Sequence, residues 1–334
     1  MKFGPVPLES AEGAILAHSI RTVTGRIRKG VRLEATHLAT LRAAGVNDVI
    51  VAMPGPEDLH EDTAAARLAA ALVPDPASAR LRITQPFTGR VNLIAEGPGV
   101  VQLDAAALNR FNLINPMITI ATVPPFQQLG AGGMVATIKI ISYAVPERDV
   151  DAAAATAPAS IRMASPVHAT AGLVITDIPG GPDNTKGRKA IADRLAALGM
   201  ELSETREVPH QTEALAQALS QISGDIAMIL TGSATSDIDD VAPSAVRHAG
   251  GHVDRFGMPV DPGNLLFLGC LDDRPVIGLP GCARSPALNG ADWVLSRVAC
   301  GIEVSGADIA AMGVGGLLKE IPTRPQPRAG RKPD

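Results

Sequence analysis

The chain has 334 residues, of which 46% are hydrophobic and 19% charged, and its formal net charge is −4. This balance is typical of a globular protein with room for two domains, and it excludes a disordered chain and a broadly basic nucleic-acid surface. The three cysteines lack C-x-x-C spacing, which excludes a zinc knuckle or a disulfide framework. No apolar run reaches the ~20 residues of a membrane span, so we expect a cytoplasmic protein with no membrane partner.

Residues 1–147 are predicted to form an α+β region that is rich in strands toward its end. Apolar periodicity and flanking glycines or prolines predict two helices, 35–44 and 56–72, and five strands, 46–51, 91–95, 100–103, 118–123 and 135–145. Several prolines and an alanine run then predict a linker over 148–166.

Residues 167–320 alternate between strand-like and helix-like segments. The predicted strands are 173–176, 200–208, 226–230, 252–257, 265–268 and 276–279, and the predicted helices are 186–198, 212–222, 240–249 and 285–300. Such alternation predicts an α/β fold with a doubly wound, mostly parallel sheet. The prolines and basic residues of 321–334 predict a disordered tail.

Three loops follow predicted strands, and ligands of open α/β sheets bind at the carboxyl ends of the strands. The loop after 226–230 is rich in hydroxyl groups, so it could cradle an anion at a helix start or simply cap that helix. The turns at 257–264 and 280–286 contain Pro-Gly, which alone is ordinary turn chemistry. Three such loops at one edge of the sheet predict a ligand site.

These loops, in this order, resemble the molybdopterin-binding domain shared by molybdopterin molybdenumtransferases and molybdopterin adenylyltransferases, over about residues 172–301. Four segments carry the resemblance: Thr231-Gly232 through Asp240-Val241-Ala242-Pro243 (T-G-G…D-V-x-P), Pro262-Gly263-Asn264-Leu265 (P-G-K-P), Gly278-Leu279-Pro280-Gly281 (G-L-P-G) and Asp183-Asn184 (D-S-N). A fainter likeness covers residues 30–51, which are similar to the stretch before that domain.

The resemblance implies binding of molybdopterin, a pterin with a dithiolene and a terminal phosphate. The phosphate would lie on the loop that begins at Thr231, where backbone N–H groups and a helix dipole favour negative charge. Asp240 would hold Mg²⁺ and, with Asp183, act in catalysis. The implied substrate-binding residues are Thr231, Gly232, Ser233, Thr235, Ser236, Asp237, Pro262, Gly263, Asn264, Pro280, Gly281, Cys282, Arg284 and Ser285.

The chain also departs from the family pattern. Ser233 stands where the family has a second glycine, and His210 stands where it often has an aspartate in a V-P-D turn. Several single residues keep two interpretations. His210 is a base or an exposed turn residue, Cys282 is a ligand contact or a small apolar residue, and Arg284 is a phosphate contact or a solvated residue at the start of the last helix.

We therefore predict a molybdopterin-binding protein that acts in molybdenum cofactor biosynthesis with other enzymes of that route. As an enzyme it would be a transferase, performing metal insertion or nucleotidyl transfer by positioning and charge neutralisation. The alternative is a non-catalytic carrier that presents the pterin to a partner such as a cytidylyltransferase. A third hypothesis keeps the fold with another nucleotide-like ligand or with none. Because relatives of this domain associate, we also expect a homo-oligomer.

Overall fold

The computed structural model describes residues 1–23, 25–261 and 263–318. The chain divides into two compact units, Met1–Ala164 and Ser165–Asp334, each with its own hydrophobic cores. The predicted tail 321–334 and the predicted site residue Pro262 lie outside the described residues. Among the described residues, no helix is both long and apolar enough to cross a membrane.

The first unit begins with a small sheet in the order β1-β5-β2. Leu41 of helix α1 and Val51 of β5 are fully buried in the core that this sheet shares with α1. The predicted helix 35–44 and strand 46–51 are confirmed to within a few residues. The elements are β1 (Lys2–Pro7), the 3-10 helix η1 (Leu8–Ser10), β2 (Ile15–Leu16), β3 (Ile20–Thr22), β4 (Gly25–Ile27), α1 (Ala35–Ala43) and β5 (Asp48–Met53).

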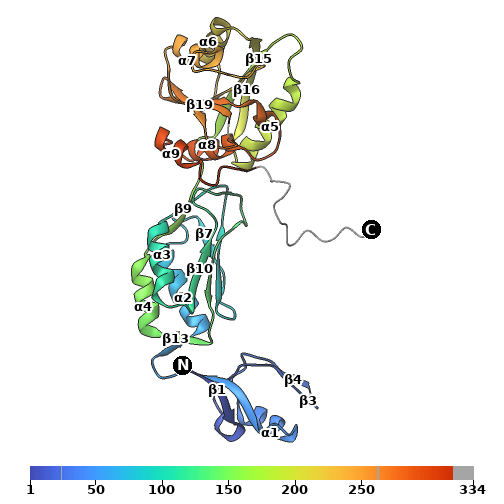
Figure 1. Cartoon of the computed structure of the whole chain (residues 1–334), viewed down its shortest axis with the longest axis vertical. Coiled ribbons are helices and arrows are strands. Elements are labelled where there is room, and N and C mark those ends of the chain that lie inside the picture. Colours follow the sequence, from blue (N-terminus) through green and yellow to red (C-terminus); the bar gives the residue numbers. More distant parts are fainter. Residues whose placement is uncertain (24, 262, 319–334) are drawn as a thin grey trace. The chain divides into compact units, whose positions relative to one another are not determined.

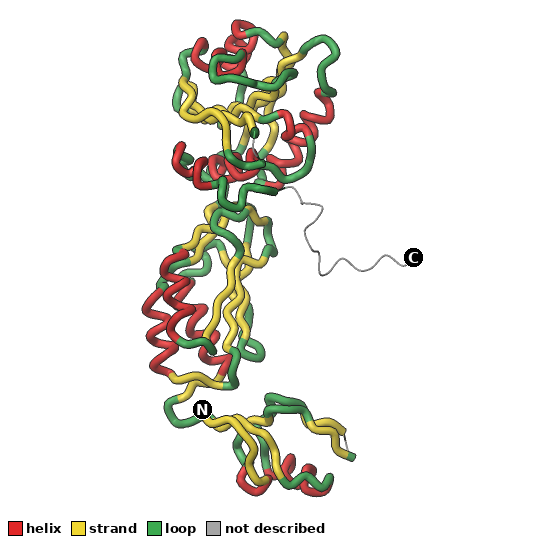
Figure 2. Tube along the Cα trace, viewed as in Figure 1, coloured by secondary structure: helices red, strands yellow, loops and turns green. Residues whose placement is uncertain are grey.

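The rest of the first unit places three helices on one side of its strands, red against yellow in Figure 2. The strands form sheets in the orders β10-β12-β8-β7, β11-β9-β14 and β13-β6. The elements are β6 (Asp58–His60), α2 (Glu61–Leu72), β7 (Leu81–Ile83), β8 (Arg90–Ala95), β9 (Gly99–Leu103), α3 (Ala105–Ile114), β10 (Ile118–Thr122), β11 (Gln128–Leu129), β12 (Met134–Ile140), β13 (Ala144–Pro146), α4 (Glu147–Thr156) and β14 (Ile161–Ala164).

Segment 148–166, where a linker was expected, contains most of α4 and all of β14. Val150 and Ala153 are buried against the first unit, so the alanine run is a close-packing helix face. The predicted helix 56–72 begins later, at Glu61, because Asp58–His60 pairs with β13. Helix α3 was not predicted; Asp104 caps its first turn by accepting from the backbone N–H of Ala107.

The second unit contains a six-stranded sheet in the order β16-β15-β17-β20-β19-β18. Strands β16, β15, β17 and β20 are parallel, whereas β19 is antiparallel to both of its neighbours. The elements are β15 (Thr170–Asp177), α5 (Asn184–Ala197), β16 (Glu201–Pro209), α6 (Thr212–Gln221), β17 (Ile226–Leu230), α7 (Val241–His248), β18 (His252–Met258), β19 (Asn264–Leu271), β20 (Arg274–Leu279), the 3-10 helix η2 (Gly281–Arg284), α8 (Gly290–Ala299) and α9 (Gly306–Ala311).

Helices cover both faces of this sheet, as Figure 1 shows for α6 and α7 on one side and α5 and α8 on the other. One core packs α5, α8 and α9 on one face, and a second packs α6 and α7 on the opposite face. The predicted doubly wound, mostly parallel α/β fold is thus confirmed. The last long helix begins at Gly290 and not at 285, because Asn289 and Asp292 form a capping box there.

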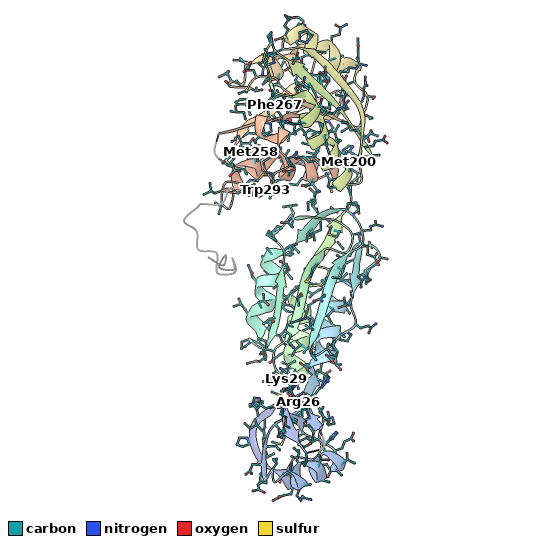
Figure 3. The ribbon with its side chains drawn as sticks, turned by 90° about the vertical axis from the view of Figure 1, so that its right-hand side faces the viewer. Arg26, Lys29, Met200, Met258, Phe267 and Trp293 are labelled. Carbon is teal, nitrogen blue, oxygen red and sulfur yellow. The ribbon has the colours of Figure 1, made fainter. Side chains whose placement is uncertain are left out.

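The sheet is packed tightly around Phe267 of β19, which is 1% exposed and is labelled in Figure 3. A Cβ atom added to Gly278 would lie 2.0 Å from Cε1 of Phe267. Gly278 on β20 is paired with Phe267 on β19 and leaves the space on the sheet face that the phenyl ring fills. At the carboxyl edge of the parallel strands, β19 begins at Asn264 and β20 ends at Leu279.

Candidate functional site

The loops expected to carry chemistry lie at one edge of the second unit's sheet. The four parallel strands end there at Asp177, Pro209, Leu230 and Leu279. Because β19 is antiparallel to β20, its first residue, Asn264, lies at the same edge. The topology therefore gathers the three predicted loops, as the sequence suggested.

The loop after β17 is held close to the end of β15. The backbone N–H of Gly232 donates to Oγ1 of Thr176 at 3.0 Å, and a Cβ on Gly232 would lie 2.7 Å from the carbonyl oxygen of Thr176. Thr231 and Thr235 are 7% and 6% exposed, with their hydroxyl oxygens 3.4 Å apart. The other predicted residues of this loop, Ser233, Ser236 and Asp237, are exposed. The buried threonines thus shape the loop, while its serines face outward.

Thr176, near the end of β15, borders the candidate site but belongs to none of the predicted motifs. Its side chain is fully buried, and its Oγ1 lies 2.8 Å from Nδ1 of His210 as well as accepting from Gly232. The backbone N–H of His210 also donates to the carbonyl of Asp177 at 3.1 Å. His210 is therefore fixed against the end of β15. Thr176 could have been found as the last residue of the predicted strand 173–176.

Arg284 joins the loop after β17 to the start of α5. Its guanidinium donates to the carbonyl of Thr231 at 3.0 Å and to Oδ1 of Asn184 at 3.3 Å. Burial lowers the pKa of this guanidinium from its usual value. Arg284 does not open the last long helix, as predicted, but ends η2. Its cationic group lies beside the Thr231 loop, where the predicted phosphate would bind.

Asp183 and Asp240, the two predicted catalytic residues, both cap helices. Oδ1 of Asp183 accepts from the backbone N–H of Thr185 at 2.9 Å, at the start of α5. Asp240 accepts from the backbone N–H groups of Val241 and Ser236 through its two carboxylate oxygens, at 2.7 and 2.8 Å. These bonds satisfy helix-terminal N–H groups and close the Thr231 loop.

The predicted Mg²⁺ has no support from the arrangement of the described residues. The carboxylates near Asp240 are engaged locally: Asp237 accepts from the backbone N–H of Asp239, and Asp239 pairs with Arg247 at 2.9 Å. Over the described ranges, no group of three His, Cys, Asp or Glu side chains is placed to hold a metal ion. Metal binding at Asp240 stays a prediction.

A cavity of about 600 Å³ lies beside the turns after β18 and β20. It takes in six of the predicted substrate-binding residues that the structure describes, but no residue of the Thr231 loop. Among the described lining residues, Asp261 is the only one with a charged side chain. The lining residues are Asp261, Gly263, Asn264, Leu265, Pro280, Gly281, Cys282, Ser285, Ala287, Leu288, Asn289 and Leu318.

Asn264 carries an unused hydrogen-bond donor at the wall of this cavity. The residue is 6% exposed, and its Oδ1 accepts from the backbone N–H of Leu266 at 3.1 Å. That bond assigns the other side-chain atom as Nδ2, which is buried and has no hydrogen-bond partner. A buried donor without an acceptor is costly, and a ligand that supplied an acceptor here would remove that cost.

The second unit is an α/β domain of the doubly wound class, in which ligands bind at the carboxyl edge of the parallel strands. Residues 178–297 match the family described as a probable molybdopterin binding domain, in agreement with the resemblance that the sequence motifs indicated. Residues 5–53 match a second family, described as a domain of unknown function. That match covers the segment 30–51, for which the sequence suggested a fainter molybdenumtransferase likeness. No curated protein matches the chain.

Two solved structures are similar over most of the chain. The molybdopterin biosynthesis moea protein from Pyrococcus horikosii is 16% identical, with 91% of this chain and 76% of that chain covered and a TM-score of 0.30. A molybdenum cofactor biosynthesis protein from Pyrococcus furiosus is 13% identical, with 93% of this chain and 65% of that chain covered and a TM-score of 0.23. Likeness this weak carries no argument about function, which rests on the family match and the site.

Proposed function

We propose that the chain binds molybdopterin at the carboxyl edge of the second unit's sheet and serves molybdenum cofactor biosynthesis. The observation that carries the proposal is the cavity of about 600 Å³, which lies between two turns of the family-matched segment. Its volume suits a small molecule, and ligands of open α/β sheets bind at this edge.

The two ends of the ligand have different sites in this proposal. The cavity offers the Asn264 amide and no basic side chain, which suits the neutral pterin ring, whose carbonyl oxygen and ring nitrogens accept hydrogen bonds. The Thr231 loop offers outward-facing hydroxyls, and the Arg284 guanidinium lies against it, which suits the terminal phosphate. A phosphate in the cavity would instead face the Asp261 carboxylate.

Equilibrium binding of purified molybdopterin to the full chain tests the proposal. Gly281 lines the cavity, and a Cβ added there meets nothing within 4 Å, so Gly281→Val fills ligand space without straining the fold. Gly130→Val is the matched control, because that glycine is exposed, equally open and outside the cavity. We expect wild type and Gly130→Val to bind alike and Gly281→Val to bind at least about tenfold more weakly.

No binding to the wild-type chain would overturn the proposal, and equal binding by Gly281→Val would move the ligand out of the cavity. Once binding is established, incubation with molybdate, or with ATP and Mg²⁺, separates the two roles left open by the sequence. Conversion of the pterin identifies a transferase. Binding without conversion, followed by transfer to a cytidylyltransferase, identifies a carrier.

A further inference from the structure

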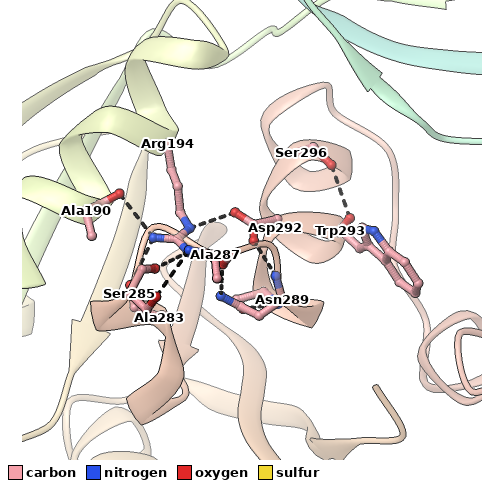
Figure 4. Close-up of polar contacts among 10 residues, drawn as sticks. Ala190, Arg194, Ala283, Ser285, Ala287, Asn289, Asp292, Trp293 and Ser296 are labelled. Carbon is pink, nitrogen blue, oxygen red and sulfur yellow. Dashed lines mark hydrogen bonds and ion pairs between the residues drawn. The ribbon is translucent and has the colours of Figure 1, made fainter. Parts of the chain in front are cut away.

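Arg194, in the last turn of α5, uses every N–H group of its guanidinium. A guanidinium has five N–H donors in a planar fork. Figure 4 shows the side chain reaching from α5 to the segment between β20 and α8. Nε donates to Oδ1 of Asp292 (2.7 Å), Nη1 to the carbonyls of Ala190 (3.1 Å) and Ala283 (2.9 Å), and Nη2 to the carbonyls of Ser285 (2.7 Å) and Ala287 (3.1 Å).

The segment that Arg194 holds is a wall of the ligand cavity. Residues 285–289 belong to no helix or strand, yet four of them line the cavity. The carbonyls of Ser285 and Ala287 therefore depend on side-chain donors, and Arg194 donates to both. Without the guanidinium, this wall would lose the two hydrogen bonds that tie its backbone to α5.

Asp292 couples this arrangement to the start of α8. One of its carboxylate oxygens pairs with Arg194, and the other accepts from the backbone N–H of Asn289 at 2.8 Å. The side chains of Arg194 and Asp292 are only 9% and 14% exposed, so solvent screens the pair weakly. The same ion pair thus orients the guanidinium and fixes the end of the wall at Asn289.

We propose that Arg194 is a positioning residue for ligand binding: it holds the wall 285–289 in the conformation that accepts the pterin. The inference rests on the proposed function for the identity of the ligand. The role of Arg194 in holding the wall rests on the hydrogen bonds alone, whatever the ligand is. Lysine cannot replace arginine in this role, because a single ammonium has three donors and cannot span four carbonyls and a carboxylate.

Four full-length chains test the role: wild type, Arg194→Lys, Arg194→Ala and the control Lys189→Ala. Lys189 lies on the same helix and forms an exposed ion pair with Asp193 at 2.8 Å, so its loss should change little. The readouts are hydrogen exchange of the 285–289 amides and the dissociation constant for molybdopterin. We expect faster exchange over 285–289 and binding weakened about tenfold or more in both Arg194 variants, and no change in Lys189→Ala.

Chemical rescue distinguishes positioning from a general loss of fold. Guanidinium ions, added well below denaturing concentrations, should restore binding to Arg194→Ala and slow exchange over 285–289, and should leave wild type unchanged. Wild-type binding by either Arg194 variant would overturn the inference, as would unchanged exchange over 285–289 in Arg194→Ala. If the wild-type chain fails to bind, the proposed function fails, and the exchange measurement still tests the role of Arg194 in holding the wall.

Discussion

Two parts of the carboxyl edge of the sheet, the Thr231 loop and the cavity, differ in how they are built. At the Thr231 loop, polar groups face outward beside a half-buried guanidinium, and the backbone approaches β15 closely at Gly232. At the cavity, the wall is mostly apolar, and a buried amide at Asn264 lacks an acceptor. One end is suited to charge and the other to a neutral ring, so a ligand that joins a heterocycle to a phosphate matches the edge as a whole.

The difference also predicts how each end responds to substitution. Interactions at an open, charged end weaken as salt screens them, whereas hydrogen bonds in an enclosed cavity are screened much less. Substitutions at the Thr231 loop should therefore act through charge and salt. Substitutions at the cavity should act through shape and the matching of donors with acceptors.

The largest effect is expected from Gly232→Val. A Cβ there would lie 2.7 Å from the carbonyl oxygen of Thr176 and 3.3 Å from the backbone nitrogen of Ile178, and neither atom belongs to a flexible side chain. We expect the free energy of unfolding to fall by more than ~2 kcal/mol, measured by urea denaturation. Gly281→Val is the comparison at the other end. If both variants kept wild-type stability, the close approach at Gly232 would not constrain the loop.

Asn264→Asp reverses the hydrogen bonding at the cavity wall while preserving its shape. Aspartate keeps the oxygen that accepts from Leu266 but replaces the unpaired donor with an acceptor. At pH 8, where the new carboxyl should be ionised, we expect molybdopterin to bind about tenfold or more weakly, with most of the loss persisting at high salt. Unchanged affinity would show that the Asn264 amide does not contact the ligand.

Ser233→Glu places a negative charge on the exposed surface of the Thr231 loop, and Ser233→Gln is the uncharged control of equal size. Repulsion of the ligand phosphate should weaken binding a few-fold in the glutamate variant alone, and added salt should remove most of the difference. Isothermal titration at two ionic strengths measures this. Equal affinities of the two variants at low salt would place the phosphate elsewhere.

The smallest effect is expected at Glu204 of β16, away from the carboxyl edge of the sheet. Hydrogen bonds from the backbone of Ser223, from Arg206 and from the Ser223 hydroxyl lower the pKa of Glu204 from 4.5 to about 2. The stabilisation by this carboxylate is present above pH 4.5 and is lost as the pH falls toward about 2.

Glu204→Gln should therefore show a smaller fall in melting temperature than wild type between pH 4.5 and 2. Glu201→Gln, an exposed change on the same strand, is the control and should follow wild type. Ligand affinity at neutral pH should be the same in all three chains, since Glu204 lies away from the carboxyl edge of the sheet. An equal fall in melting temperature for wild type and Glu204→Gln between pH 4.5 and 2 would contradict the stabilising role of the Glu204 carboxylate.

The sequence predicted the second unit well, because each parallel strand and helix has a strong apolar pattern of its own. The pure apolar run 226–230 is confirmed residue for residue as β17. The first unit was harder, since alanine-rich α4 resembles a linker until its burial is known. Propensity identifies such a helix poorly, because tertiary packing determines whether its small residues are buried.

Within the candidate site, the sequence indicated the turns but not what holds them. Asn264 and Gly281 follow from motifs in local sequence, and both line the cavity. Arg194 has no local signal, because its partners Ala283 and Asp292 lie 89 and 98 residues further along the chain. Asp240 caps α7, a role that an aspartate at a helix start also favours, and its metal binding stays a prediction.

Hydrogen exchange of the full chain, with and without purified molybdopterin, tests the central claim most directly. The account predicts slower exchange in three places upon binding: the amides following Thr231, those following Asn264 and those of 281–289. Protection should be absent from the first unit, residues 1–164. Binding that protects the first unit, or that leaves these three segments of the second unit unchanged, would contradict a molybdopterin site at this edge of the sheet.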